Sequence, residues 1–266
     1  LEIRSLILDS DSNALKSLYS INNATIRNNV KNLLTEKEWF LTLQDSSIDK
    51  IKDTLIFIDK IDNNYAISLF DQFSDDEIIK KIQENFIIGL TYILSIIWKL
   101  NKQKTKTIIA EFDNDYIYEN LLNYIRNHKE ERNLQVISDF FHKIYSVDSD
   151  KAIKLFSKMG YDEINSLLTL YDVPAIVSFL SEIKRINQEM ASSFFDSIDF
   201  ELLCDKIVKE PANKILNSIS EIKYLNEDKA RQLIFYTREV LIKTIPNIKL
   251  ETFLSYEKKG IIVIEK

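Results

Sequence analysis

A 13-residue pattern recurs along the chain, and it constrains the fold more than any other feature. Residues 183–195 read IKRINQEMASSFF, and stretches that match it begin at residues 58, 97, 144 and 222. The steps between successive copies, in chain order, are therefore 39, 47, 39 and 39 residues. A weaker copy begins at Leu18, 40 residues before Ile58. Self-similarity with a period of about 20–50 residues indicates a repeat architecture.

An apolar stripe leads into each copy and predicts a first helix. Its members are spaced by four, three and three residues, which places them on one face of an α-helix. The stripes are Ile51, Leu55, Ile58 and Ile61; Leu90, Leu94, Ile97 and Leu100; Ile137, Phe141, Ile144 and Val147; Ile176, Leu180, Ile183 and Ile186; and Ile215, Ile219, Ile222 and Leu225.

Each stripe ends at an Asn or Asp, which predicts the N-cap of a second helix because its side-chain oxygen can accept a bond from an unpaired backbone N–H. A small residue four positions later would let this helix approach its neighbour closely. A third segment follows, either as a separate helix or as the second half of a broken one, and we favour a separate helix. The predicted caps are Asn22, Asp62, Asn101, Asp148, Asn187 and Asn226, followed for the third segment by Ser74, Asp113, Gly160 and Asp199.

The single 47-residue step points to an insertion within Leu122–Val136. Eight extra residues correspond to about two helical turns, so that an extended helix and a loop fit equally well. Insertions in repeat proteins often project on the binding face.

Together these patterns predict an all-α fold, a right-handed α-solenoid of about six 39-residue helical repeats. With three Gly and three Pro, the chain has little of the turn chemistry that a sheet protein needs. The array should span 1–249, followed by 250–266 as a tail or the start of a further domain, with a short strand in GIIVIEK. Because the chain begins with Leu1, we expect a piece of a longer protein. The units are expected near 11–50, 51–89, 90–136, 137–175, 176–214 and 215–249.

The sequence shows no active site, and we expect no catalytic residue, cofactor or metal site. The two histidines, His128 and His142, are far apart, and no Cys/His cluster has metal-ligand spacing. Cys204 lies beside an apolar helix face, where a structural role is expected, and a single cysteine suits the reducing cytoplasm. The longest apolar run, Phe86–Trp98, is shorter than the roughly 20 residues of a membrane span. An enzyme with carboxylates in a groove remains an alternative.

Two charged stretches are candidate contact surfaces, although charge runs are usually solvated faces. The first crosses a turn between helices, and the second lies in the insertion. We expect the partner to be another protein, because a net charge of −6 disfavours nucleic acid. The alternative is a nucleic-acid-binding array in which the first stretch shares a face with Lys143, Lys151 and Lys154. The candidates are Lys99, Lys102, Lys104 and Lys106 in the first stretch, and Arg126, His128, Lys129 and Arg132 in the second.

The repeat LSEIKRINQEMASSFFDSIDFELLCDKI, Leu180–Ile207, resembles helical repeats in the C-terminal sensor regions of prokaryotic signal-transducing ATPases of the STAND class. The resemblance covers about Leu15 to Val240. It implies a recognition arm without catalytic residues, since nothing here matches the phosphate-binding loop of the family's ATPase module. More broadly, the chain is similar to HEAT, armadillo and tetratricopeptide (TPR) solenoids, which suggests a protein-binding scaffold or a sensor. A purely structural spacer is the remaining reading.

Overall fold

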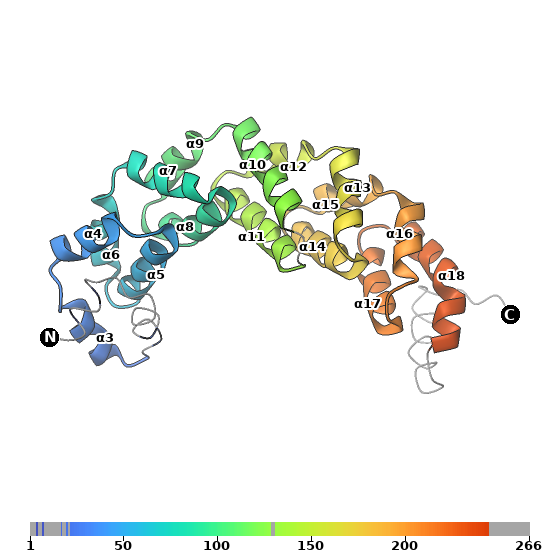
Figure 1. The fold of residues 1–266 in the computed structure, drawn as a ribbon, viewed down its shortest axis with the longest axis horizontal. Helices are drawn as coiled ribbons and strands as arrows, with labels where there is room; N and C mark the ends of the chain where they lie inside the picture. Colours follow the sequence, from blue (N-terminus) through green and yellow to red (C-terminus); the bar gives the residue numbers. More distant parts are fainter. Residues whose placement is uncertain are drawn as a thin grey trace. The chain divides into compact units, whose positions relative to one another are not determined.

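The protein is all-α in the part that the structure describes (Figure 1). The structure is a computed structural model that describes residues 22–128 and 131–244, together with 4, 7, 17 and 20. Every element within these ranges that has defined bounds is a helix. None of the described helices is long and apolar enough to cross a bilayer. The tail 250–266, with the strand expected in GIIVIEK, lies outside the described residues.

The helices fall into three classes that repeat in chain order. First helices carry the apolar stripes, and are α5 (Ile48–Asp59), α8 (Phe86–Leu100), α11 (Glu131–Val147), α14 (Val173–Ile186) and α17 (Ala212–Lys223). Second helices are α3 (Ala24–Lys31), α6 (Asn63–Asp71), α9 (Lys102–Ala110), α12 (Ser149–Ser157), α15 (Gln188–Asp196) and α18 (Glu227–Thr244). Third helices are α4 (Glu36–Gln44), α7 (Asp75–Glu84), α10 (Asn114–Asn127), α13 (Tyr161–Leu170) and α16 (Phe200–Ile207).

The chain divides into two compact units, one made of 1–120 and 146–149, the other of 121–145 and 150–266. In the first unit, α5 packs against α6 and α8, and α8 also packs against α7 and α9. In the second unit, α14 packs against α15 and α17, and α17 packs against α18. Figure 1 shows these groups of neighbouring helices in each unit. In both units, therefore, first helices pack on one another and on their second helices.

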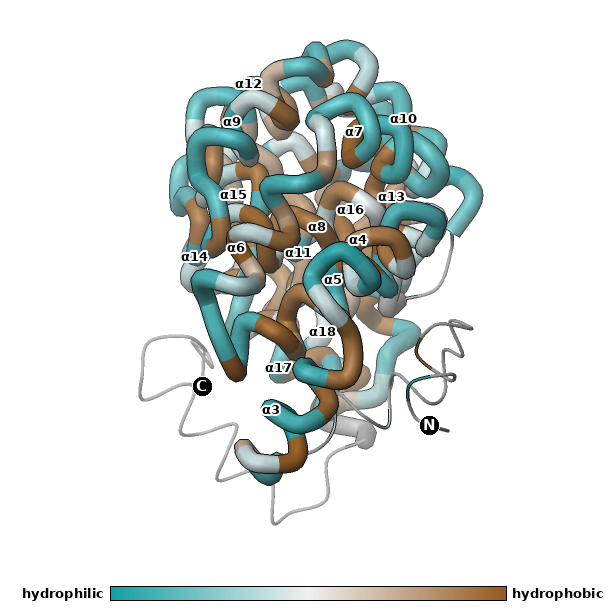
Figure 2. The backbone as a smooth tube through the Cα atoms, turned by 90° about the vertical axis from the view of Figure 1, so that its left-hand side faces the viewer, coloured by the Kyte–Doolittle hydropathy of each residue, from teal (hydrophilic) through white to brown (hydrophobic). Residues whose placement is uncertain are grey.

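The apolar stripes form the core of each unit, as the spacing predicts. Leu90, Leu94 and Ile97 of α8 are buried, as are Ile215, Ile219 and Ile222 of α17. The small residues of the second helices are buried as well, including Thr105, which is fully enclosed although it replaces the usual Ala. Figure 2 shows hydrophobic stretches within the helices separated by hydrophilic turns. Burial of these stripes removes apolar surface from water and supplies most of the driving force for folding.

The predicted Asn and Asp caps lie at the starts of second helices. The side chains of Asp62, Asn101 and Asn187 accept bonds of 3.1, 3.0 and 3.1 Å from the backbone N–H three residues later. The weak first copy is corrected by one residue, because its cap is Asn23 and not Asn22. Asn23 lies 39 residues before Asp62, so the first copy keeps the common period, and Val30 takes its buried position.

Third helices also begin at the predicted positions, as separate helices. Ser74, Asp113 and Asp199 each accept a bond from a backbone N–H of their helix, and Gly160 is the N-cap of α13 without a side-chain bond. The insertion lengthens two helices. α10 has 14 residues, whereas α7 and α13 have 10, and α11 is the longest first helix with 17. Residues 129 and 130, between α10 and α11, lie outside the described part.

Candidate interaction surfaces

Three pairs of successive second helices are joined by a bond between the last residue of one helix and the cap of the next. In the first unit, Lys31 Nζ at the end of α3 donates to Asp62 Oδ2 at 3.1 Å. Asn101 Nδ2 donates to Asp71 Oδ1, at the end of α6, at 2.9 Å. In the second unit, Asn226 Nδ2 donates to Asp196 Oδ1 at 2.8 Å. In these three pairs, the Asp cap faces a cation and each Asn cap faces a carboxylate.

A lysine in the first turn of two second helices binds the end of the preceding second helix. Lys104 Nζ donates to the carbonyls of Phe70 and Phe73, and lies 4.7 Å from the centroid of the Phe70 ring. Lys229 Nζ donates to the carbonyl of Phe195 at 3.2 Å in the second unit. These amines are additional partners at the helix ends, since the carbonyls of Phe70 and Phe195 also accept bonds from the N–H of Phe73 and Ile198.

Two pairs of third helices are joined in the same way by a lysine in the last turn. Lys81 Nζ of α7 donates to the carbonyl of Ser46 at 2.7 Å, just after α4. Lys206 Nζ of α16 donates to the carbonyls of Leu168 and Tyr171 at the end of α13. Burial lowers the pKa of Lys206, an effect that the carboxylate of Asp172 partly offsets. We refer to these lysine contacts with helix ends as lysine clamps.

The four lysines of the first charged stretch have different surroundings. Lys99 Nζ lies 2.5 Å from Asp59 Oδ2 on the neighbouring first helix. Lys104 is a clamp, and burial lowers its pKa more than the carboxylates of Asp75, Asp71 and Glu77 raise it. Lys102 and Lys106 are exposed one helical turn apart on α9, and Lys102 Nζ lies 5.4 Å from the Trp98 ring. Lys99 is exposed as well but is held by its ion pair, so the exposed lysines of this stretch outside that pair and the clamp are Lys102 and Lys106.

The second charged stretch ends α10 and begins α11. Arg126 is exposed in the last turn of α10. The His128 ring stacks on Tyr124 with centroids 4.2 Å apart, and its backbone carbonyl accepts a bond from the Tyr171 hydroxyl. Lys129 lies outside the described residues, and Arg132 belongs to α11 with its side chain undescribed. His128 therefore helps to hold the C-terminal end of α10 in place through its ring and its backbone carbonyl.

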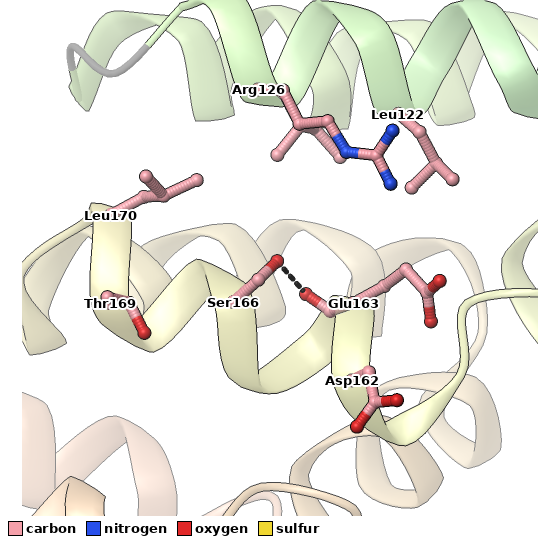
Figure 3. Close-up of a pocket in the computed structure, with 8 residues that line it drawn as sticks. Leu122, Arg126, Asp162, Glu163, Ser166, Thr169 and Leu170 are labelled. Carbon is pink, nitrogen blue, oxygen red and sulfur yellow. Dashed lines mark hydrogen bonds between the residues drawn. The ribbon is translucent and has the colours of Figure 1, made fainter.

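A groove lies between α10 and α13 in the second unit, with a volume of about 480 Å³ (Figure 3). The extended end of α10 forms one wall, and the length of α13 forms the other. Arg126 projects from the first wall towards the second, which carries two carboxylates and two hydroxyls. The residues that line it are Leu122, Ile125 and Arg126 of α10, and Asp162, Glu163, Ser166, Thr169 and Leu170 of α13.

A second, smaller groove of about 350 Å³ lies along first helices of the same unit. Lys214 at its edge pairs with Asp172, whose carboxylate is 3.2 Å from the amine. The groove has one cation and no other charged side chain among the residues that line it. These residues are Leu134, Gln135, Pro174, Ala175, Ser178, Phe179 and Lys214.

The remaining candidates for chemistry lie in structural positions. Cys204 is buried, and burial raises the pKa of its thiol to about 11, which keeps the thiol protonated at neutral pH. His142 Nε2 lies 3.7 Å from Glu182 Oε2, between α11 and α14. Among the described residues, no group of three or more His, Cys, Asp or Glu side chains is arranged to hold a metal ion.

The sequence prediction found one wall of the larger groove and missed the other. Arg126 was a candidate because it lies in the insertion, whereas Asp162, Glu163 and Leu170 had no distinguishing pattern. One departure from the repeat carries a signal for them, because Gly160 replaces the Ser, Thr or Asp cap of the other third helices. Leu167 stands where α7 and α16 have Lys81 and Lys206, although α4 and α10 also lack a lysine there. The pair α10 and α13 consequently has no lysine clamp at this position.

Comparison with known proteins gives no family assignment. No protein-family model, curated protein or solved structure matches the chain.

Proposed function

We propose that the chain is a right-handed α-solenoid of about six 39-residue repeats that binds another protein and carries out no catalysis. The supporting observation is that equivalent residues of successive repeats make equivalent contacts in each unit. Asn101 and Lys104 contact the end of α6 as Asn226 and Lys229 contact the end of α15. Stacked repeats that each contact their neighbours form extended surfaces, which solenoids use to bind other proteins.

On this proposal the chain acts as a HEAT-, armadillo- or TPR-like scaffold or sensor arm in the cytoplasm, as the resemblance to STAND-class sensor regions implies. The groove between α10 and α13 supports a binding role because it has an apolar floor and a polar rim. Binding sites commonly combine these two features. Two features therefore support protein binding: the equivalent contacts between repeats, and the groove between α10 and α13.

The test is capture of a partner by the purified chain from an extract of the cell that makes it. The extract is treated with nuclease, and binding is compared at about 50 and 200 mM salt, a range over which phosphate-driven affinity falls steeply. We expect a protein that stays bound at the higher salt and then binds the chain when both are purified. Retention of nothing would favour a structural spacer.

A variant of the exposed lysine face distinguishes nucleic-acid binding from protein binding. Lys102→Glu with Lys106→Glu reverses two exposed charges and leaves the clamp at Lys104 intact. Protein capture should be unchanged in this variant. The nucleic-acid-binding alternative would be correct if three results coincide. Nucleic acid binds the wild type in extract that has not been treated with nuclease, it binds only at low salt, and the variant does not retain it.

A further inference from the structure

The groove between α10 and α13 has a floor and walls that differ in chemistry. Ile125 is buried at its base, and Leu122 and Leu170 are half-buried beside it. Figure 3 shows the Arg126 side chain reaching from α10 into the space between the two helices. Its volume of about 480 Å³ is within the range of ligand-binding clefts. An occupant would therefore place an apolar group on the floor and polar groups along the rim.

The α13 wall offers hydrogen-bond acceptors. Ser166 Oγ already donates to the carbonyl of Glu163 at 2.6 Å, and Thr169 Oγ1 donates to the carbonyl of Asn165 at 3.3 Å. With their protons directed into the helix, both hydroxyl oxygens present lone pairs to the groove. The carboxylates of Asp162 and Glu163 are acceptors as well. This wall therefore favours a group that donates.

A change of cap leaves the Glu163 carboxylate available. In α4 and α7, the equivalent residues Glu38 and Glu77 accept bonds from the backbone N–H and hydroxyl of Thr35 and Ser74, which form capping boxes. In α13 the cap is Gly160, which has no side chain to offer. Among the described residues, Glu163 forms no ion pair with Arg126 or any other cation.

We propose that this groove binds a segment of a partner protein in which a lysine or arginine lies next to an aliphatic residue. The cation faces the Asp162 and Glu163 carboxylates, and the aliphatic side chain covers Leu122 and Leu170. Arg126 on the opposite wall orients the segment by pairing with a carboxylate or backbone carbonyl. Two carboxylates against one guanidinium leave the rim negative, which favours a basic segment and disfavours nucleic acid. The inference rests on the proposed protein-binding function and specifies its partner.

The test is selection of random peptides displayed on phage against the full chain. Peptides retained by the wild type should be enriched in a Lys or Arg adjacent to Leu, Ile or Val. A synthetic peptide of the enriched sequence, measured by fluorescence anisotropy, should bind the Asp162→Asn, Glu163→Gln variant about tenfold more weakly, because two charge-assisted bonds are lost. The matched control is Asp76→Asn, the equivalent position on α7, which should bind as the wild type does.

A second variant is expected to raise the stability of the chain and to weaken its binding of the peptide. Gly160→Ser supplies the missing cap, and its Cβ would lie 2.8 Å from Glu163 Oε2, so the flexible carboxylate must move and can enter a capping box. We expect a higher melting temperature than the wild type and several-fold weaker peptide binding. A purely structural role for Glu163 would raise stability and leave binding unchanged.

Three outcomes would overturn the proposal: no peptide enriched over a control without protein, enriched peptides without a basic residue, or equal binding by the wild type and the double variant. The proposed function is tested separately by partner capture. If a captured protein binds the double variant as well as the wild type, the chain still binds proteins, but through another surface.

Discussion

At the scale of single residues, the choice between Asn and Asp at three of the second-helix caps matches the side chain that each cap faces. Both residue types can cap a helix, because each has an oxygen that accepts a backbone N–H. Only Asn also has an amide N–H donor, which can bond to a carboxylate on the neighbouring helix. Asn101 and Asn226 donate to Asp71 and Asp196, whereas Asp62 accepts from Lys31. The cap bond from the Tyr65 N–H, and secondarily the bond from the Lys31 amine, lower the pKa of Asp62.

Exchange of these pairs gives the first prediction. Asn101→Asp keeps the cap but places a carboxylate beside Asp71, and should lower the free energy of unfolding by about 1 kcal/mol. Adding Asp71→Lys recreates the arrangement of Lys31 and Asp62, and should recover at least half of the loss. Urea unfolding of the four proteins of the cycle measures the coupling.

Asn187→Asp is the control for this cycle, because the preceding second helix, α12, ends at Ser157 and has no carboxylate there. Its free energy of unfolding should change by less than that of Asn101→Asp. Equal losses in the two single variants would show that the carboxylate of Asp71 is not the cause.

The lysine clamp gives the second prediction. Lys104→Met keeps most of the side-chain stem over Phe70 but removes the donor to the carbonyls of Phe70 and Phe73. The loss of charge-assisted bonds outweighs the desolvation of the amine that is relieved, so unfolding should become easier by about 1 kcal/mol. Lys106→Met, on the exposed side of the same helix, should stay within about 0.5 kcal/mol of the wild type. Thermal unfolding followed by circular dichroism distinguishes the two.

At the scale of elements, the sequence predicted the helices well where the repeat was strong. The stripes of α8 and α17 identified buried faces because a period near 3.6 determines which side chains face a neighbour. The cap of α3 was placed one residue early because the first copy lacks the small residue and the pair of apolar residues that follow the cap in the other copies. The groove could not be predicted in full, since it depends on α10 lying beside a helix about 40 residues later.

The capping boxes give the third prediction, which concerns pH. The bond from the backbone N–H of Ser74 and the contact with Gln44 lower the pKa of Glu77 below its usual value of 4.5. A carboxyl with a lowered folded-state pKa stabilises the protein above the unfolded-state pKa, and this contribution is lost as the pH falls through the folded-state value. Stability should therefore decrease as the pH falls below about 4.5.

Glu77→Gln keeps an acceptor for the Ser74 N–H but cannot titrate. The melting temperature of this variant should fall less steeply between neutral and acid pH than that of the wild type. Glu84→Gln, in the exposed last turn of the same helix, serves as the control and should retain the wild-type slope. If the melting temperatures of both variants depend equally weakly on pH, general surface charge and not the capping box causes the pH dependence.

At the scale of the whole molecule, a solenoid predicts that one complete repeat can be removed. Deleting 173–211 removes 39 residues, the period of the array, and joins Asp172 to Ala212, so that Asp172 becomes the cap of α17 as it is now the cap of α14. The shortened chain should remain helical and cooperative with lower stability, because repeat stability is a sum over units and interfaces. Its denaturant m-value should fall with the surface that is lost.

Deletion of 173–192 is the comparison for this experiment, since it leaves the register of the repeat broken. That protein should aggregate or unfold without cooperativity. Equal behaviour of the two deletions, measured by circular dichroism and urea unfolding, would contradict the solenoid arrangement.

The lysine clamps have a consequence for synthesis on the ribosome, because each lysine binds a residue that was translated earlier. Lys104 binds Phe70, 34 residues earlier, and Lys206 binds Leu168, 38 residues earlier. A nascent helix such as α6 or α13 therefore emerges with its terminal carbonyls unpaired by the clamp until the following repeat has been translated. At roughly 5–20 residues per second, this delay lasts on the order of seconds. At these clamped helix ends, each repeat therefore receives its last contacts from the repeat that is translated after it.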